Sequence, residues 1–277
     1  MHRPTLALVA GVALALGIAA GPSTAGAAPA YAPADTATIH PGVQTFTEGG
    51  QCTANFIYTS GSDTYIGQAA HCSSTGAATD TNGCTSGTLP IGTAVEIGGA
   101  DHPGTLAYSS WNTMQAVGET DPDACAYNDL ALIRVDPADV AKVNPSIPHW
   151  GGPTGLNTTG TTGSVYSYGN SSLRQGITLL SPKLGLTSST EGNGWTHVVN
   201  TVTPGIPGDS GSAFVNASGQ AIGVLSTLAL APVPLSNNVS DIGKMLAYAN
   251  AETGAGYQLV DGTEAFTPKL LGLLPLG

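Results

Sequence analysis

The chain consists largely of short runs of β-forming residues separated by turn-forming residues. It contains 38 glycines and 19 prolines, and only 9% of its residues are charged. Apolar residues at helical spacing are scarce. This pattern predicts an all-β barrel or sandwich. The runs are Thr53–Thr59, Thr64–Ile66, Ala94–Ile97, Leu130–Val135, Ser164–Tyr168, Gly176–Leu180, His197–Val202, Ala213–Val215 and Ala221–Thr227.

One segment near the end of the chain has the pattern of a helix. From Asp241 to Glu252, Ser240 or Asp241 can cap the first turn. One face of this helix would be apolar, formed by Ile242, Met245, Leu246 and Ala249. We therefore expect a single helix after the last strand.

The stretch Pro207–Ser212 places Ser210 between two glycines, directly after Asp209. A serine hydroxyl is a poor nucleophile unless a base removes its proton and hydrogen-bond donors stabilise the oxyanion. Flanking glycines suit a backbone that bends sharply and points its own N–H groups into a site. The same residues also form ordinary turns, so a functional interpretation requires a matching histidine and aspartate.

Both partners are present earlier in the chain. His71 lies in the stretch Gly67–Cys72, which ends a strand-like run, and Asp129 opens the apolar run that reaches Val135. The strings AAHC, NDLALI and GDSG, in this order, resemble those of the chymotrypsin-like (trypsin-fold) serine peptidases, particularly their secreted bacterial branch. Subtilisins and α/β-hydrolases use other chain orders. The resemblance covers roughly residues 44–250.

The resemblance implies an all-β fold of two packed six-stranded antiparallel β-barrels with a C-terminal helix. The peptidase domain would span residues 50–254. Barrel 1 would take about residues 50–145, barrel 2 about residues 155–240, and the helix residues 241–252. A connection rich in proline and glycine, from Pro145 to Gly155, separates the two halves. The site would lie in the cleft between the barrels.

The resemblance also assigns catalytic roles. Ser210 would attack the scissile carbonyl, His71 would transfer the proton, and Asp129 would orient the imidazole. The backbone N–H groups of Gly208 and Ser210 would form the oxyanion hole.

Animal relatives pair the residue matching Asp209 with a new N-terminus, but no IVGG-like start occurs here. A buried carboxylate needs a cation, and we expect Arg174 to supply it.

Substrate-binding residues are expected on two segments, around Pro204 and at Ser226, Thr227 and Leu228. Pro204 stands where trypsin-like members place an aspartate, so a preference for Arg or Lys is not expected. A bulky Leu228 would narrow the pocket and favour small or medium apolar residues before the scissile bond. Ser226 should form a hydrogen bond near Asp129.

The N-terminus has the pattern of an export signal. A short charged start is followed by an apolar stretch and then by small residues up to Ala30. We assign residues 1–30 to the signal and 31–49 to an N-terminal arm or a short propeptide. Cleavage could follow Ala27, Ala28 or Ala30. Residues 255–277 form a C-terminal tail that either packs on the domain or is loose. These assignments predict a secreted protein.

Four cysteines after an export signal indicate two disulfides, and the count alone leaves the pairing open. The resemblance favours Cys52–Cys72, which would anchor the loop that carries His71. Cys84–Cys125 would then clamp a long loop next to Asp129. The sequence contains no CxxC pair that would indicate a zinc site, so neither a metal nor another cofactor is expected.

The net charge of −11 argues against nucleic acid and anionic lipid as partners. We expect a monomer that acts on polypeptide substrates and does not associate with a membrane once the signal is removed. Two other functions fit the same residues: a catalytically silent binding protein on this fold, and an esterase that uses the same triad.

Overall fold

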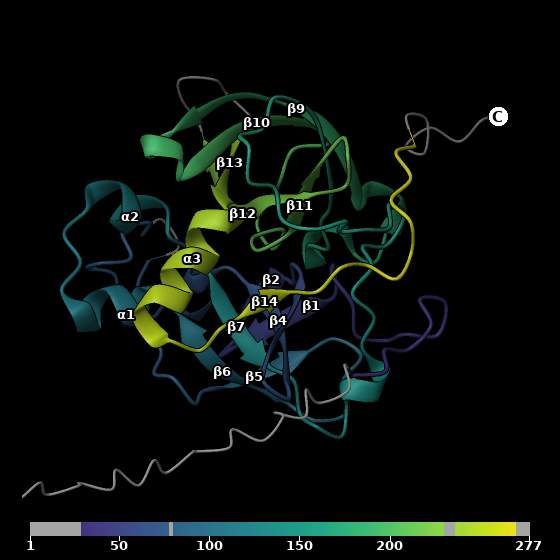
Figure 1. The fold of residues 1–277 in the computed structure, drawn as a ribbon, viewed down its shortest axis with the longest axis horizontal. Helices are drawn as coiled ribbons and strands as arrows, with labels where there is room; N and C mark the ends of the chain where they lie inside the picture. The colour runs from purple at the N-terminus through teal and green to yellow at the C-terminus, as the bar shows by residue number, and fades with distance from the viewer. Residues whose placement is uncertain (1–28, 78–79, 230–235, 270–277) are drawn as a thin grey trace, which may run out of the picture.

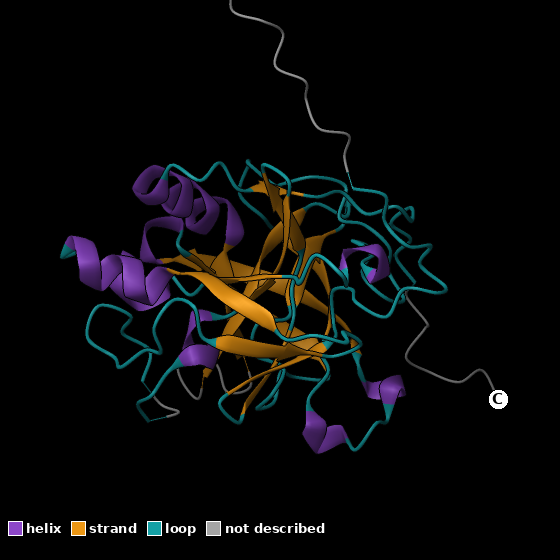
Figure 2. Cartoon of the chain, turned by 90° about the horizontal axis from the view of Figure 1, so that it is seen from below, coloured by secondary structure: helices purple, strands orange, loops and turns teal. Residues whose placement is uncertain are grey.

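The computed structural model describes residues 29–77, 80–229 and 236–269, with the side chains of residues 228 and 229 left out. Its strands form two antiparallel sheets, one mainly from the first half of the chain and one from the second half (Figure 1). The strands lie in the interior, and helical segments lie at the periphery (Figure 2). Most of the predicted signal, with the possible cleavage sites after Ala27 and Ala28, lies outside the described residues.

The second half forms a closed barrel of six strands in the order β10-β13-β12-β11-β8-β9. Its interior is a separate apolar cluster that includes Val165, Val199 and Phe214. The strands are β8 (Gly163–Tyr168), β9 (Pro182–Glu191), β10 (Thr196–Val202), β11 (Ala213–Asn216), β12 (Ala221–Ala229) and β13 (Ser236–Asp241).

The first half forms an eight-stranded sheet in the order β14-β3-β4-β7-β6-β5-β1-β2. The strands are β1 (Gln44–Thr47), β2 (Gly50–Thr53), β3 (Ile57–Ser60), β4 (Asp63–Gln68), β5 (Ala94–Ile97), β6 (Gly104–Ser109) and β7 (Ala131–Arg134), together with β14 (Gln258–Leu259). The fold is therefore mostly β and has the expected trypsin-like double-barrel plan. In the first half, however, a strand from the C-terminal segment extends the sheet to eight strands.

Three α-helices of the described residues lie outside the sheets. The expected C-terminal helix is α3 (Ile242–Thr253), and its apolar face is buried as predicted. The Asp241 side chain caps it by accepting the Lys244 N–H at 2.8 Å. Two further helices, α1 (Ser110–Val117) and α2 (Pro122–Tyr127), lie between β6 and β7 and were not predicted.

Two predicted strands differ in the structure. Gly176–Leu180 is not a strand, because Gln175 and Gly176 both adopt positive φ and the chain then enters a 3-10 turn. Thr53–Thr59 is divided into β2 and β3. Between them the Asn55 side chain accepts the backbone N–H of Phe56 at 2.8 Å, in place of a strand partner.

Both ends of the described chain pack on the domain. In the N-terminal arm, Ala32 N–H donates to Val143 O at 2.9 Å, and the arm then leads into β1. In the C-terminal segment, Thr267 N–H donates to Trp150 O at 2.7 Å. Residues 32–47 are thus part of the first half, which begins before residue 50. No helix in the described ranges is long and apolar enough to cross a membrane.

Candidate active site

His71 and Asp129 lie together at the end of the first barrel. His71 is on a 3-10 turn (Ala70–Ser73) that follows β4, and Asp129 lies between α2 and β7. Asp129 Oδ2 is 2.7 Å from His71 Nδ1, and Asp129 Oδ1 accepts the backbone N–H of His71 at 2.9 Å. Only 5% of the Asp129 side chain is exposed, against 23% for His71. The imidazole therefore has one buried partner and one accessible side.

A residue of the second barrel also forms a hydrogen bond with Asp129. Ser226, on β12, donates its hydroxyl to Asp129 Oδ2 at 2.6 Å. The carboxylate thus accepts from an imidazole, a backbone N–H and a hydroxyl. This contact confirms the expected hydrogen bond of Ser226 and joins the two halves of the chain at the site.

The charge of Asp129 determines how readily His71 takes up a proton. Burial alone would lower the pKa of His71, but the charge of Asp129 and its hydrogen bond outweigh burial and raise that pKa above the ordinary 6.5. A histidine held by a carboxylate in this way can act as a general base.

Ser210 lies in a sharp turn between two glycines with positive φ, 92° at Gly208 and 90° at Gly211. The first barrel holds this turn, because Thr53 N–H donates to Ser210 O at 2.8 Å and Thr53 Oγ1 donates to Gly208 O at 2.8 Å. Among the described residues, no protein acceptor takes the N–H of Gly208 or Ser210. Both N–H groups are thus available to a ligand.

The described residues include no hydrogen bond between the Ser210 hydroxyl and His71. Catalytic hydrogen bonds are often long or poorly aligned in unliganded structures and tighten when substrate binds. The structure joins His71 to Asp129 directly. Ser210 belongs to the second barrel, and its carbonyl accepts the N–H of Thr53, the neighbour of Cys52, whose disulfide partner Cys72 directly follows His71.

Asp209 is fully buried and holds two cations. The guanidinium of Arg174 binds both carboxylate oxygens, with Nη2 at 2.6 Å from Oδ2, as expected. Lys183 Nζ lies 3.0 Å from the same Oδ2 and was not predicted. Burial would raise the pKa of the Asp209 carboxyl, but Arg174 and Lys183 hold it below its ordinary value.

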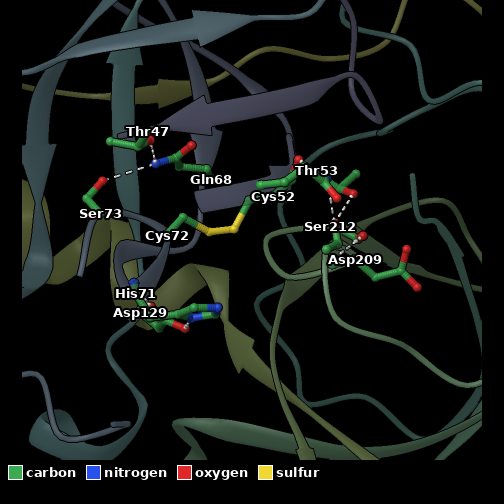
Figure 3. Close-up of a disulfide and its surroundings, with 12 residues drawn as sticks. Thr47, Cys52, Thr53, Gln68, His71, Cys72, Ser73, Asp129, Asp209 and Ser212 are labelled. Carbon is green, nitrogen blue, oxygen red and sulfur yellow. Dashed lines mark hydrogen bonds and ion pairs between the residues drawn. A yellow bond between two sulfur atoms is a disulfide. The ribbon is translucent and has the colours of Figure 1, made fainter. Parts of the chain in front are cut away.

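Both expected disulfides are present in the structure. Cys52–Cys72 joins β2 to the turn that carries His71, and Figure 3 shows it beside the His71–Asp129 pair. Cys84–Cys125 anchors α2 next to Asp129. His71 lies near Cys52 and Cys72 in an arrangement that could hold a metal, but both sulfur atoms are bonded to each other and offer no thiolate.

The two expected substrate-binding segments are bridged by a buried residue that was not predicted. Asn237 accepts the N–H of Gly205 at 2.9 Å and donates to Thr227 O at 3.4 Å. Pro204, beside Gly205, borders a pocket of about 440 Å³ with Ile206, Leu173 and Leu180. Neither Ser226 nor Thr227 is among the residues that line this pocket. The side chain of Leu228 lies outside the described residues.

The fold and the site together define a chymotrypsin-like double barrel. Residues 43–231 match the trypsin family, and because this is more than half of the chain, the protein belongs to that family. No curated protein matches the chain.

Two solved structures with TM-scores of 0.52 and 0.50 agree with this assignment at the level of the fold. Thermobifida fusca protease A is 20% identical with a TM-score of 0.52, and the match covers 81% of this chain and 99% of that one. A glutamic acid-specific serine protease is 16% identical with a TM-score of 0.50, covering 80% and 100%. Nocardiopsis protease is 20% identical with a TM-score of 0.48, covering 80% and 98%.

Proposed function

We propose that the protein is a secreted serine endopeptidase that cleaves peptide bonds through an acyl-enzyme at Ser210. The observation that carries this proposal is the 2.7 Å contact between Asp129 Oδ2 and His71 Nδ1. This contact fixes the imidazole tautomer in which Nδ1 carries a proton and leaves Nε2 free to accept one. Membership of the trypsin family supports the same chemistry.

In the proposed reaction, His71 Nε2 takes the proton of the Ser210 hydroxyl as the oxygen attacks the scissile carbonyl. The protonated imidazole then gives this proton to the leaving amine, and water hydrolyses the ester by the same route. The free N–H groups of Gly208 and Ser210 would stabilise the oxyanion. Asp129 would stabilise the imidazolium that forms.

We further propose a preference for small or medium apolar residues before the scissile bond. Pro204 brings no charge to the expected wall, and the pocket beside it is lined largely by apolar side chains. Arg174 also borders this pocket, but its charge is paired with Asp209. A largely apolar pocket discriminates modestly, since one methylene is worth about 1–3 kcal/mol. The proposal of secretion rests on the export-signal pattern and on two disulfides, which form in oxidising compartments.

Digestion of a peptide library with the purified protein tests this function. We expect cleavage after small or medium apolar residues, and no cleavage by a Ser210→Ala variant prepared in the same way. Much faster cleavage after Arg or Lys would contradict the proposed preference. Hydrolysis of simple esters without peptide cleavage would instead favour the esterase.

A further inference from the structure

Lys183 is a long cationic side chain in a fully buried position. It lies at the start of β9, paired with Ser167 of β8, and is 0% exposed. Burying an ammonium group is costly unless its donors find acceptors. Burial lowers the pKa of Lys183 from its ordinary 10.5, although Asp209 partly opposes this. The contacts that compensate for burial therefore indicate what the residue does.

The ammonium group has three acceptors, which are as many as its N–H donors. Lys183 Nζ lies 3.0 Å from Asp209 Oδ2, 3.2 Å from Pro204 O and 3.3 Å from Thr203 O. Thr203 and Pro204 begin the segment that leads to the candidate nucleophile, and Asp209 ends it. One ammonium group thus binds both ends of the segment Thr203–Asp209.

Neutralising Asp209 does not by itself require Lys183. Arg174 already binds both carboxylate oxygens, so the described cluster holds two cations for one carboxylate. What Lys183 adds is its pair of bonds to the carbonyls of Thr203 and Pro204. Among the described residues, the side-chain hydrogen bonds of Arg174 go to Asp209 and not to these carbonyls.

The segment itself is folded tightly around the Asp209 carboxylate. Ile206 N–H donates to Asp209 Oδ2 at 3.1 Å, and Asp209 N–H donates to Ile206 O at 2.9 Å. The neighbouring Gly169 leaves no room for a side chain, because a Cβ there would lie 2.9 Å from Lys183 Cε. The lysine is therefore fixed by packing as well as by its three bonds.

This segment contains Pro204 of the expected substrate pocket and Gly208 of the proposed oxyanion hole. We propose that Lys183 is a positioning residue that makes the pocket wall and the oxyanion loop one rigid unit. Recognition of the residue before the scissile bond then depends on the same contacts as stabilisation of the oxyanion. This proposal rests on the proposed peptidase function.

The test compares Lys183→Met with Arg174→Met and with Lys244→Met, a substitution of an exposed lysine. We would measure kcat and KM on peptide anilides that differ only in an Ala, Leu or Phe before the scissile bond. Lys183→Met should lower kcat about 10- to 100-fold, somewhat less than the 10²–10³-fold loss for a deleted oxyanion donor. It should also change the ratio of kcat/KM between Ala and Phe substrates.

The two control variants separate this role from general stability. Arg174→Met keeps the bonds of Lys183 to Thr203 and Pro204, although Arg174 also borders the pocket, so it should lower kcat and change the Ala-to-Phe ratio less than Lys183→Met does. Lys244→Met should match the wild-type protein in both. An unchanged ratio and an unchanged kcat in folded Lys183→Met would overturn the proposal. So would the same change of ratio in Arg174→Met.

A measurement on the wild-type protein covers the case in which Lys183→Met does not fold. The charged groups that face Lys183 are Asp209 and Arg174. When Lys183 loses its proton at high pH, the neutral amine has only two N–H donors and loses at least one of the three contacts. The Ala-to-Phe ratio should therefore shift as the pH rises through the pKa of Lys183, which burial lowers below its ordinary 10.5, whereas the titration of His71 affects both substrates equally. A constant ratio would contradict the proposal. Absence of any wild-type hydrolysis would instead contradict the peptidase function.

Discussion

The carboxylate of Asp129 holds His71 at two points. One oxygen lies 2.7 Å from the imidazole Nδ1, and the other accepts the backbone N–H of the same residue at 2.9 Å. The side chain and the main chain of His71 are therefore positioned by a single buried group. Rotation of the carboxylate would break both contacts, so the orientation of the imidazole depends on Asp129.

Replacing Asp129 by asparagine should nearly abolish catalysis while the fold is kept. The amide of asparagine carries no charge, so it cannot stabilise the imidazolium. It also cannot accept from both N–H groups of His71, and its NH2 group favours the wrong imidazole tautomer. We expect kcat to fall about 10⁴-fold. Steady-state kinetics on a peptide anilide would measure this, with Asp35→Asn, at an exposed position, as the control. A loss of less than about tenfold would show that Asp129 does not orient the base.

The pH dependence of kcat/KM should follow the protonation of His71. Only the neutral imidazole can accept the Ser210 proton, so activity should be lost as the pH falls through the pKa of His71. Burial acts to lower this pKa, but Asp129 raises it above the ordinary 6.5. The midpoint of the acid limb should therefore lie above pH 6.5. A midpoint below that value, measured on the free enzyme, would contradict this electrostatic account.

Substitution of Gly208 by valine should distort the oxyanion hole. Gly208 has φ of 92°, and a Cβ there would collide with the side chain of Gln51. The peptide would have to tilt, and we expect a loss of about 10²–10³-fold in kcat, as for a deleted donor. Gly92→Val is the matched control, because Gly92 has φ of 99° and open space around it. Equal kcat losses in the two variants would mean that backbone strain alone explains the effect.

The two disulfides should differ in their effect on activity. Replacing Cys52 and Cys72 by alanine releases the turn that carries His71, so both stability and kcat should fall. The Cys84 and Cys125 double variant should lose stability with much less change in kcat. The bridges join residues 20 and 41 positions apart, so the cost should be about 3–4 kcal/mol in each case. Thermal unfolding and anilide kinetics would be measured on both double variants. An equal loss of kcat in the two variants would contradict this prediction.

Much of the candidate site could be predicted from the sequence because its residues lie in distinctive strings. His71, Asp129 and Ser210 each stand in a motif whose chain order separates this fold from other serine hydrolases. Lys183 could not be found in this way, since it stands in an ordinary strand far from Asp209 in the sequence. A cation becomes informative only when the fold shows that it is buried.

The secondary structure was predictable where the side-chain pattern dominates and not where backbone conformation decides. The helix from Ile242 was evident from its cap and its apolar face. The apolar run at Gly176–Leu180 resembles a strand, but positive φ at Gln175 and Gly176 turns the chain instead. The short helix at Pro122 did have sequence signals, a capping Asp121 followed by proline, but its six residues are too few to show a period.

The most direct measurement of the central claim is covalent labelling of Ser210. The protein would be treated with a fluorophosphonate probe at about pH 8, where a neutral His71 can activate the serine hydroxyl, and the adduct would be located by peptide mass spectrometry. The proposed triad predicts one probe per chain, attached to Ser210, and no labelling of a folded His71→Ala variant. An unlabelled wild-type protein, or labelling of Ser210 that persists without His71, would contradict it.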